Sequence, residues 1–418
     1  MVNMKTGLIG ALDVGTNKVA CLIAVPDEDH YRVIGMGHQQ ARGMRGGVVA
    51  DMDLAEQSIR NAIDQAERMA GETLRNVFVS FSGGNIRSRI MRVEIPINDQ
   101  FISDMDIHRL HLQCRGGVEN SVWQILHTIP VSYMVDGVPN VDDPRRMVAS
   151  TLAADMHVIA VPTGPLRNLA LCVERCILSI SGITVSAYAS ALAILYQDQM
   201  RLGATLLDLG GGATSVSVFR DNRLYFVDSV PVGSNHITND IARGLNTSTI
   251  NAERLKTRYG SAIASPMDER EFINVPRLID DERGSGNQIA KSALVGIITP
   301  RVEEIFELVR ERIGSLNGKI MSGQKIILTG GGSQLEGIDE LAQRVLDKPV
   351  IIGQHHGVRG LGPNAVGPAF TATAGLLRYA DIAHLVASLT RATDCDNTKN
   401  TFGRLGRWFK HNLWEGRA

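Results

Sequence analysis

The chain has 418 residues, which allows more than one domain at the usual length of about 100–200 residues per domain. Hydrophobic residues make up 44% and charged residues 21% of the sequence, as expected for a globular protein with a sizeable core. The formal net charge of -1 provides no overall field to attract nucleic acid or a membrane, and we expect no nucleic-acid partner. Five cysteines without a Cys-x-x-Cys pair predict reduced thiols in a cytoplasmic protein.

The N-terminal segment predicts a meander of three strands, followed by a helix and a further strand. The first strand runs directly into a glycine loop, residues 11–18 (ALDVGTNK), in which Asp13 precedes the turn. Apolar residues recur at helical spacing over residues 53–70, with Asp53 near the N-cap, and a strand at 76–81 follows. The strands of the meander are expected at residues 8–14, 19–25 and 31–36.

A change of pattern from Gly84 to about Val161 indicates an inserted module. The segment predicts short strands and charged segments, and His127 is interpreted as a structural residue within it. Chain breaks are expected at its prolines, which are Pro96, Pro130, Pro139 and Pro144.

An uncharged stretch at residues 176–197 has the length of a membrane span. It also contains four serines and Gly182, which divide it into two apolar runs. We therefore expect a strand and then a helix here, within a helix–strand–helix unit at residues 164–193.

A second copy of the strand and turn pattern opens at Thr205. It contains residues 207–214 (LDLGGGAT), with Asp208 before the turn, and a third glycine loop follows at 328–333 (LTGGGS). Glycine lets backbone N–H groups approach phosphate oxygens, and carboxylates can hold a hydrated Mg²⁺ ion. The doubling predicts two related α/β lobes around a nucleotide cleft, in which Asp13 and Asp208 hold Mg²⁺ through water.

The C-terminal segment has a pattern of its own. Residues 388–400 are polar and predict a flexible linker, and residues 402–413 have one apolar and one basic face at the helical step. This is typical of a helix in a membrane interface, with Trp414 off the apolar face; a helix docked on the protein's own core or on a partner is the alternative. The apolar face is Phe402, Leu405, Trp408, Phe409 and Leu413, and the basic face is Arg404, Arg407, Lys410 and His411.

The three glycine loops in this order resemble those of the actin-like ATPases, where they are called phosphate-1, phosphate-2 and adenosine motifs. Residues 42–48 (RGMRGGV), 62–67 (AIDQAE) and 126–133 (LHTIPVSY) narrow the resemblance to the FtsA family of bacterial cell-division proteins. The resemblance implies an α/β, actin-like (ribonuclease H-like) two-lobed ATPase fold with an inserted 1C subdomain, a flexible linker and a C-terminal amphipathic helix.

The resemblance also implies a division into subdomains. Subdomain 1A is expected at residues 1–83, 163–200 and 366–385, and the inserted subdomain 1C at 84–162. Subdomain 2A is expected at 201–232 and 306–365, and subdomain 2B at 233–305. The linker is expected at 386–401 and the membrane-targeting helix at 402–418.

The site residues carried over from the family fall on all three loops. They are Asp13, Gly15, Thr16, Asn17 and Lys18; Asp208, Gly210, Gly211, Gly212 and Thr214; and Gly330, Gly331 and Gly332. Glu253 and Lys256 match the helix that reaches the adenosine. Phosphate-2 usually has Thr directly after its third glycine and often Asp two residues later, where this chain has Ala213 and Ser215. Either Thr214 supplies the hydroxyl after a small shift, or that contact is lost.

The function implied by the family is that of an ATP-binding, filament-forming adaptor with at most weak ATPase activity and no identifiable catalytic residue. It anchors the FtsZ ring to anionic lipid on the cytoplasmic face of the inner membrane at the division site, and recruits later division proteins. Arg301 and Glu304 lie where the family binds the FtsZ C-terminal peptide. A PilM-type pilus-assembly protein and a soluble actin-like phosphotransferase remain as alternatives.

Overall fold

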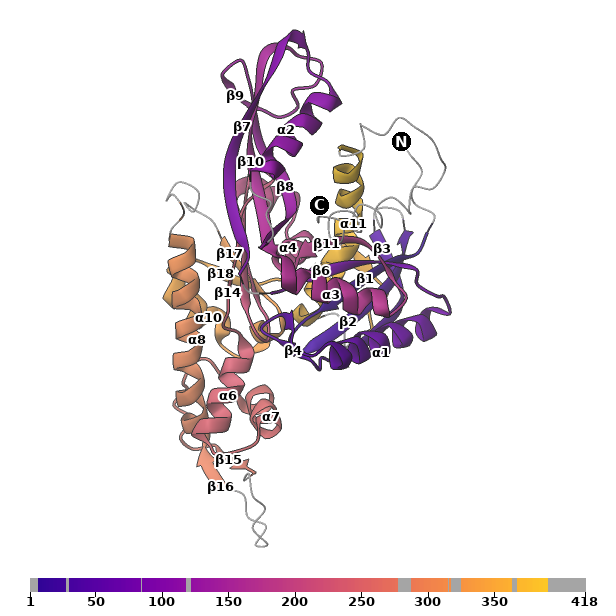
Figure 1. Ribbon diagram of the computed structural model, residues 1–418. Coiled ribbons are helices and arrows are strands. Elements are labelled where there is room, and N and C mark those ends of the chain that lie inside the picture. Colours follow the sequence, from indigo (N-terminus) through magenta and orange to yellow (C-terminus); the bar gives the residue numbers. More distant parts are fainter. Residues whose placement is uncertain are drawn as a thin grey trace.

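The protein is a mixed α/β molecule with two lobes beside each other and a module that projects beyond both (Figure 1). The computed structural model describes residues 7–27, 30–83, 85–117, 122–276, 287–314, 316, 325–362 and 367–389. No helix in these ranges is long and apolar enough to cross a membrane. The membrane-binding residues expected between Phe402 and Leu413 lie outside the described residues.

The first lobe contains a six-stranded sheet in the order β11-β6-β1-β2-β3-β19. Strands β1, β2 and β3 form the antiparallel meander that the sequence predicted. Strand β6 pairs in parallel with β1, and β11 pairs in parallel with β6. Every residue of β1 after Ile9 is buried, because helices cover both faces of the sheet at its centre. The strands are β1 (Ile9–Val14), β2 (Lys18–Asp27), β3 (His30–Gln40), β6 (Asn76–Phe81), β11 (Ser179–Val185) and β19 (Val358–Arg359).

The second lobe repeats this topology in a five-stranded sheet, β14-β13-β12-β17-β18. Three antiparallel strands are again followed by two parallel additions, so β12 corresponds to β1 and β17 to β6. The internal doubling predicted from sequence is therefore confirmed. The strands are β12 (Ala204–Leu209), β13 (Thr214–Arg220), β14 (Arg223–Val230), β17 (Lys325–Thr329) and β18 (Val350–Ile352).

Helix α1 (Met52–Ala70) covers one face of the first sheet. Its buried side chains recur at helical spacing and pack against β3, as the apolar pattern predicted. The helix begins one residue earlier than expected, and Asp53 lies near its N-cap as predicted. The N-cap is Asp51, whose carboxylate accepts hydrogen bonds from the backbone N–H groups of Asp53 and Leu54. The short pair β4 (Met44–Arg45) and β5 (Val48–Val49) precedes α1, and α3 (Thr163–Arg175) packs beside it.

The inserted module is a four-stranded antiparallel sheet, β7-β10-β8-β9, with α2 on one face. The expectation of short strands is wrong, since three of its strands have 13 to 15 residues. Pro96 and Pro130 lie inside strands at register shifts, where a proline without an N–H is tolerated. The elements are β7 (Arg87–Phe101), α2 (Asp104–Gly116), β8 (Trp123–Val135), β9 (Val138–Val141) and β10 (Val148–Pro162).

The inserted module contacts both lobes. In the second lobe, the guanidinium of Arg223 donates hydrogen bonds to the carbonyl of Pro130 and, at 2.9 Å, to Asp142. Toward the first lobe, buried His127 lies 3.0 Å from the hydroxyl of Thr184, and its ring packs edge-on against Tyr188. His127 is thus a structural residue, as expected.

The second lobe has an insertion of its own between β14 and β17. It consists mainly of helices and ends in a two-stranded hairpin at the far end of the molecule from β9 (Figure 1). Its elements are α6 (Ser234–Gly244), α7 (Thr249–Tyr259), β15 (Phe272–Val275), β16 (Asn287–Ala290) and α8 (Lys291–Gly314). The lobe is completed by η1 (Gly331–Gln334) and α10 (Ile338–Leu346).

Two helices lie where the lobes meet. The uncharged stretch forms β11 and then α4 (Ser186–Ile194), as predicted, and α5 (Gln197–Leu202) leads into the second lobe. After η3 (Pro368–Phe370), the chain returns to the first lobe through α11 (Thr371–Leu389), which packs along α4. Residues 386–389 were expected in the linker but belong to this helix; residues 390–401 lie outside the described residues.

Candidate functional site

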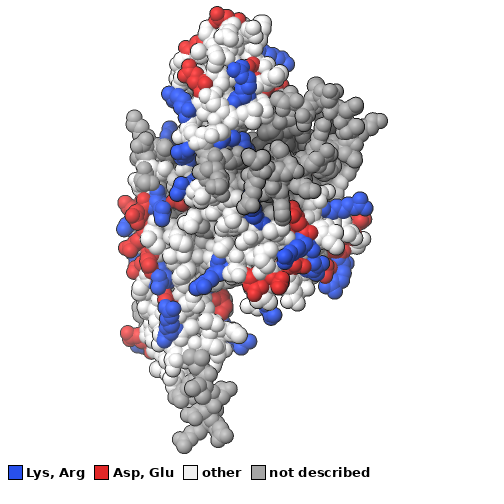
Figure 2. All heavy atoms as spheres, in the orientation of Figure 1, with Lys and Arg blue, Asp and Glu red and all other residues white. Residues whose placement is uncertain are grey.

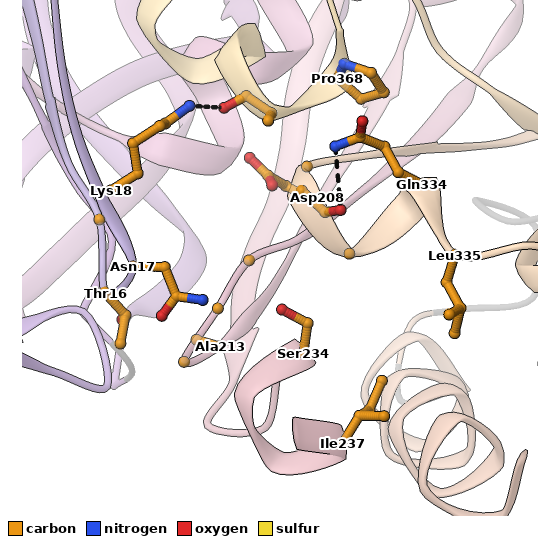
Figure 3. Close-up of a pocket in the computed structure, with 18 of the residues that line it drawn as sticks. Thr16, Asn17, Lys18, Asp208, Ala213, Ser234, Ile237, Gln334, Leu335 and Pro368 are labelled. Carbon is orange, nitrogen blue, oxygen red and sulfur yellow. Dashed lines mark hydrogen bonds between the residues drawn. The ribbon is translucent and has the colours of Figure 1, made fainter. Parts of the chain in front are cut away.

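A cavity of about 580 Å³ lies between the two lobes and is lined by all three glycine loops. Thr16, Asn17 and Lys18 face it from the first lobe, and Asp208 and Ser234 face it from the second (Figure 3). Of the nucleotide-binding residues carried over from the family, every one except Thr214 lines this cavity. The sequence therefore placed residues from four separate segments at one site.

The first hairpin joins β1 to β2 and presents Asp13 and Lys18. The turn is closed by a hydrogen bond from the Gly15 N–H to the Lys18 carbonyl, 2.9 Å long. The Asp13 carboxylate accepts a hydrogen bond from the hydroxyl of Ser80 in the neighbouring strand, and burial raises the pKa of Asp13. Burial lowers the pKa of Lys18 to about 8, an effect that Asp13 and Asp208 oppose.

The Lys18 side chain crosses toward α11 rather than pointing at either carboxylate. Its ammonium group donates a hydrogen bond to the carbonyl of Ala369 and lies 3.4 Å from the centre of the Phe370 ring. The first hairpin is thereby tied to the segment that begins α11, at the wall of the cavity.

The second hairpin joins β12 to β13 and presents Asp208. Its Oδ2 atom accepts a 2.6 Å hydrogen bond from the hydroxyl of Ser190, and burial raises the pKa of Asp208 to about 6. Gly330 has a φ of +86°, and a Cβ atom there would lie 2.3 Å from Asp208 Oδ1. Glycine is required at this position, both for the backbone conformation and for the space that Asp208 occupies.

A pair of amides connects the lobes beside the glycine hairpins. Asn17 of the first hairpin and Asn235 at the start of α6 exchange two side-chain hydrogen bonds of 2.5 Å each. The N–H of Ser234 also donates to the Gly210 carbonyl at 2.9 Å. The N–H of Asn235 likewise donates to the Gly211 carbonyl at 2.8 Å, so the start of α6 is fixed against the second hairpin.

A polar cluster on α7 also lines the cavity, where the Lys256 ammonium donates a 3.2 Å hydrogen bond to the Ser234 carbonyl. Lys256 and Glu253, one turn apart on α7, form an ion pair of 2.7 Å. The hydroxyl of Thr238 is 2.8 Å from the Lys256 ammonium and donates to the Glu253 carboxylate. These groups offer hydrogen-bond donors and acceptors of the kind that bind sugar hydroxyls.

Thr214 does not line the cavity, which agrees with the second of its two alternatives, that the hydroxyl contact is lost. Its side chain is fully buried, and its hydroxyl donates a 2.7 Å hydrogen bond to the carbonyl of Val232. Successive residues of a strand point to opposite faces, so Ser215 lines the cavity and Thr214 does not.

Sequence reasoning also missed the hydroxyl and amide partners, Ser80, Ser190 and Asn235. Only one of them left a local signal: Ser186 and Ser190 are four residues apart, which places both on one face of a helix that follows a strand.

The predicted FtsZ-binding residues lie outside the cavity, on α8. The Arg301 guanidinium donates a 2.5 Å hydrogen bond to Asp240 of α6 and pairs with Glu304 on its own helix. Acidic and basic side chains alternate along this edge of the molecule (Figure 2). Among the described residues, no cluster of three or more His, Cys, Asp or Glu side chains is arranged to hold a metal ion by itself.

Two lobes with one shared strand order, each with a glycine hairpin at a common cleft, define an actin-like fold. The PilM–PilN type IV pilus biogenesis complex contains a chain with this fold at a TM-score of 0.62 and 15% identity, covering 88% of this chain and 97% of that one. The structure of MreB5 of Spiroplasma citri bound to ADP matches with a TM-score of 0.56 and 15% identity, and the match covers 92% of this chain and 99% of that one. At these identities the likeness concerns the fold alone.

The sequence comparisons are more specific. A family described as "Cell division protein FtsA" matches residues 205–375, and the "SHS2 domain inserted in FTSA" matches residues 83–160, which is the projecting module. The cell division protein FtsA of Agrobacterium fabrum is 36% identical over 423 residues, covering 98% of this chain and 96% of the relative. The chain belongs to the FtsA family of cell division proteins, which decides against the two alternatives left open by the sequence.

Proposed function

We propose that the protein binds ATP and Mg²⁺ in the cleft, polymerises when ATP closes the lobes, and anchors the FtsZ ring to the cytoplasmic face of the inner membrane. One observation carries the proposal: two equivalent hairpins, each with a carboxylate before its turn, face each other across one cavity. Two lobes that hold one ligand between them are drawn together by it, since each contributes contacts that the other cannot make.

The donor groups fit a nucleotide with Mg²⁺. Phosphate oxygens would be bound by backbone N–H groups of the glycine hairpins, such as that of Gly211, and Asp13 and Asp208 would hold the ion through water. Burial raises the pKa of both carboxylates, so a cation nearby would relieve the cost of keeping them ionised. When bound, Mg²⁺ offsets the negative charge of the phosphates.

The polar cluster on α7 supports the binding of a nucleoside in the same cavity. We propose that Glu253 and Lys256 bind the ribose and that the adenosine loop closes over the base. A solved protein of the same fold, MreB5, is described as bound to ADP. We propose only weak hydrolysis, because Ala213 and Ser215 replace the side chains usual in phosphate-2 and Thr214 faces away from the cavity.

We propose that the FtsZ C-terminal peptide docks on α8 beside Arg301. Asp240 and Glu304 hold the guanidinium in a fixed orientation, which reduces the entropy lost when it binds a carboxylate of the peptide. Arg301→Glu should reduce the affinity for this peptide at least tenfold, measured by fluorescence anisotropy. Arg312→Glu, on the same helix but away from Asp240, is the matched control and should retain binding.

Attachment to the membrane is proposed for the tail. A basic residue near an anionic surface contributes only about 1 kcal/mol, so one short helix binds weakly and reversibly. Alignment of many tails on a filament makes each later insertion intramolecular, which can raise the avidity by roughly 10²–10⁴-fold. A membrane anchor of this size therefore requires a polymer.

Co-sedimentation with vesicles of anionic lipid tests the proposal. The full chain should pellet more strongly with ATP, and a chain ending at Asn400 should stay in solution in both conditions. Trp408→Glu, on the apolar face, should release the full chain, whereas Trp414→Glu, off that face, should release it less. If the truncated chain pellets with the lipid, or if ATP has no effect on the full chain, the tethered-filament proposal is wrong.

A further inference from the structure

Asp13 and Asp208 occupy equivalent positions in the two lobes, one residue before the end of β1 and of β12. In each lobe a hydroxyl residue of the neighbouring parallel strand stands in register with the aspartate. Ser80 of β6 is opposite Asp13, and Thr329 of β17 is opposite Asp208. The duplicated fold therefore offers the same hydrogen bond to each carboxylate.

Only the first lobe uses that bond. Ser80 donates to Asp13, whereas the Thr329 hydroxyl lies 2.8 Å from the hydroxyl of Thr371 at the start of α11. Asp208 is instead bonded by Ser190 of α4, at 2.6 Å. The first carboxylate is thus held by its own sheet, and the second by the helix through which the chain passes from one lobe to the other.

The position of Ser190 is itself closely fixed. Ser190 is fully buried, and its neighbour Ala189 contacts α11 backbone to backbone: a Cβ atom added at Gly375 would lie 1.8 Å from the Ala189 carbonyl oxygen. Asp208 in turn lies against Gly330 on its other side. A movement of α4 relative to the second sheet must therefore move one partner of this hydrogen bond or break the bond.

We propose that Ser190 is a positioning residue for the Mg²⁺ ion: by holding one oxygen of Asp208 it fixes the orientation of the carboxylate that would bind the metal-bound water, and it couples this orientation to the position of α4. A hydroxyl bonded to a carboxylate is a strong, directional contact that orients a ligand from behind. The inference rests on the proposed binding of ATP and Mg²⁺. It predicts that lobe movement disturbs Asp208 and leaves Asp13 in place.

The test compares two buried serines of the full chain. Ser190 donates to Asp208, and Ser217 of β13 donates to the carbonyl of Ala187 on the same helix at 3.2 Å without contacting the carboxylate. ATP affinity is measured by calorimetry, with Mg²⁺ and with EDTA, for wild type, Ser190→Ala and Ser217→Ala. Ser190→Ala should bind ATP about tenfold more weakly with Mg²⁺ and within twofold of wild type with EDTA. Ser217→Ala should match wild type in both conditions.

Each other outcome has a definite meaning. If Ser190→Ala keeps the wild-type affinity with Mg²⁺, or loses affinity equally with Mg²⁺ and EDTA, Ser190 does not position a metal ligand. If both variants lose the same affinity, ATP binding depends on the contact between α4 and the second lobe and not on the hydrogen bond from Ser190 to Asp208. If wild type shows no Mg²⁺-dependent ATP binding, the proposed function itself fails. Should Ser190→Ala not fold, Ser190→Cys, a similar volume with a weaker donor, provides the same comparison.

Discussion

The two lobes share one strand order, but the segments inserted into them differ in place and in kind. The first lobe extends after β6 into a four-stranded sheet with one helix, and the second extends after β14 into three helices and a small hairpin. The shared part lines the cleft, since both glycine hairpins belong to it. The parts that are not shared form the two ends of the molecule (Figure 1). The repeat thus makes one site, and the insertions make two different outer surfaces.

The largest difference between the two lobes should be in their stability at acidic pH. The first-lobe insertion buries four histidines, and burial lowers the pKa of three of them, of His111 to about 4, of His127 to about 3 and of His157 to about 4. Their neutral forms stabilise the fold fully above about pH 6.5, and this stability is lost as the pH falls toward 4. Three such groups together weaken folding by up to about 4 kcal/mol per pH unit in this range.

Hydrogen exchange measured from pH 7 to pH 5 locates this effect. Amides of β8 and β10 should lose protection at a higher pH than amides of β12 and β13. Equal loss in both sheets would contradict the assignment of the acid sensitivity to the insertion.

Neutralising the second carboxylate should have opposite effects on stability and on binding. Burial raises the pKa of Asp208 from 3.8 to about 6, so the ionised group weakens folding above pH 6 and ceases to do so below about pH 4. Asp208→Asn should raise the free energy of unfolding of the nucleotide-free protein at pH 7.5 by on the order of 2 kcal/mol. It should weaken Mg²⁺-dependent ATP binding about 100-fold.

Thermal unfolding at pH 7.5 and pH 5, together with calorimetric ATP titration, measures both effects. Asp13→Asn is the counterpart in the first lobe and should change stability in the same direction, since burial raises that pKa too. A loss of stability in Asp208→Asn at pH 7.5 would contradict the prediction.

The contact between α4 and α11, where the lobes meet, should tolerate an added side chain less well than the insertion of the second lobe does. In Gly375→Ala, the new methyl group meets the Ala189 carbonyl of α4, so the two helices must separate at a cost of about 2 kcal/mol or more. Gly296→Ala on α8 is the matched control, because a Cβ atom there meets nothing within 4 Å. It should be neutral or stabilise by up to about 1 kcal/mol. Urea unfolding of both variants gives the comparison, and equal stability would show that α4 and α11 can move apart freely.

The smallest effect distinguishes the two faces of β13. Thr214→Val removes a buried hydrogen bond to Val232 and should reduce stability by about 1 kcal/mol, with ATP affinity unchanged. Ser215→Ala, one residue on and facing the cavity, should lower ATP affinity several-fold at nearly constant stability. Calorimetry and thermal unfolding of both variants measure these effects. A loss of ATP affinity in Thr214→Val would show that the Thr214 hydroxyl contributes to nucleotide binding after all.

Local chemistry was enough to predict much of this molecule from its sequence. The meander, helix α1, the order of β11 and α4, and the three glycine loops were all recognised because apolar periodicity and turn residues act over a few neighbouring positions. The repeated order of strands and loops was also enough to predict two lobes and a shared cleft, and most of the residues that line the cavity.

Pairing between distant segments decided the rest. The face on which Thr214 lies depends on the register of β12 and β13, and the long strands of the insertion run through prolines because register shifts absorb them. Asn17 and Asn235 are 218 residues apart, and Ser190 reaches Asp208 only because α4 crosses from one lobe to the other. A sequence specifies which residues can donate and accept, and the packing of the lobes determines which of them meet.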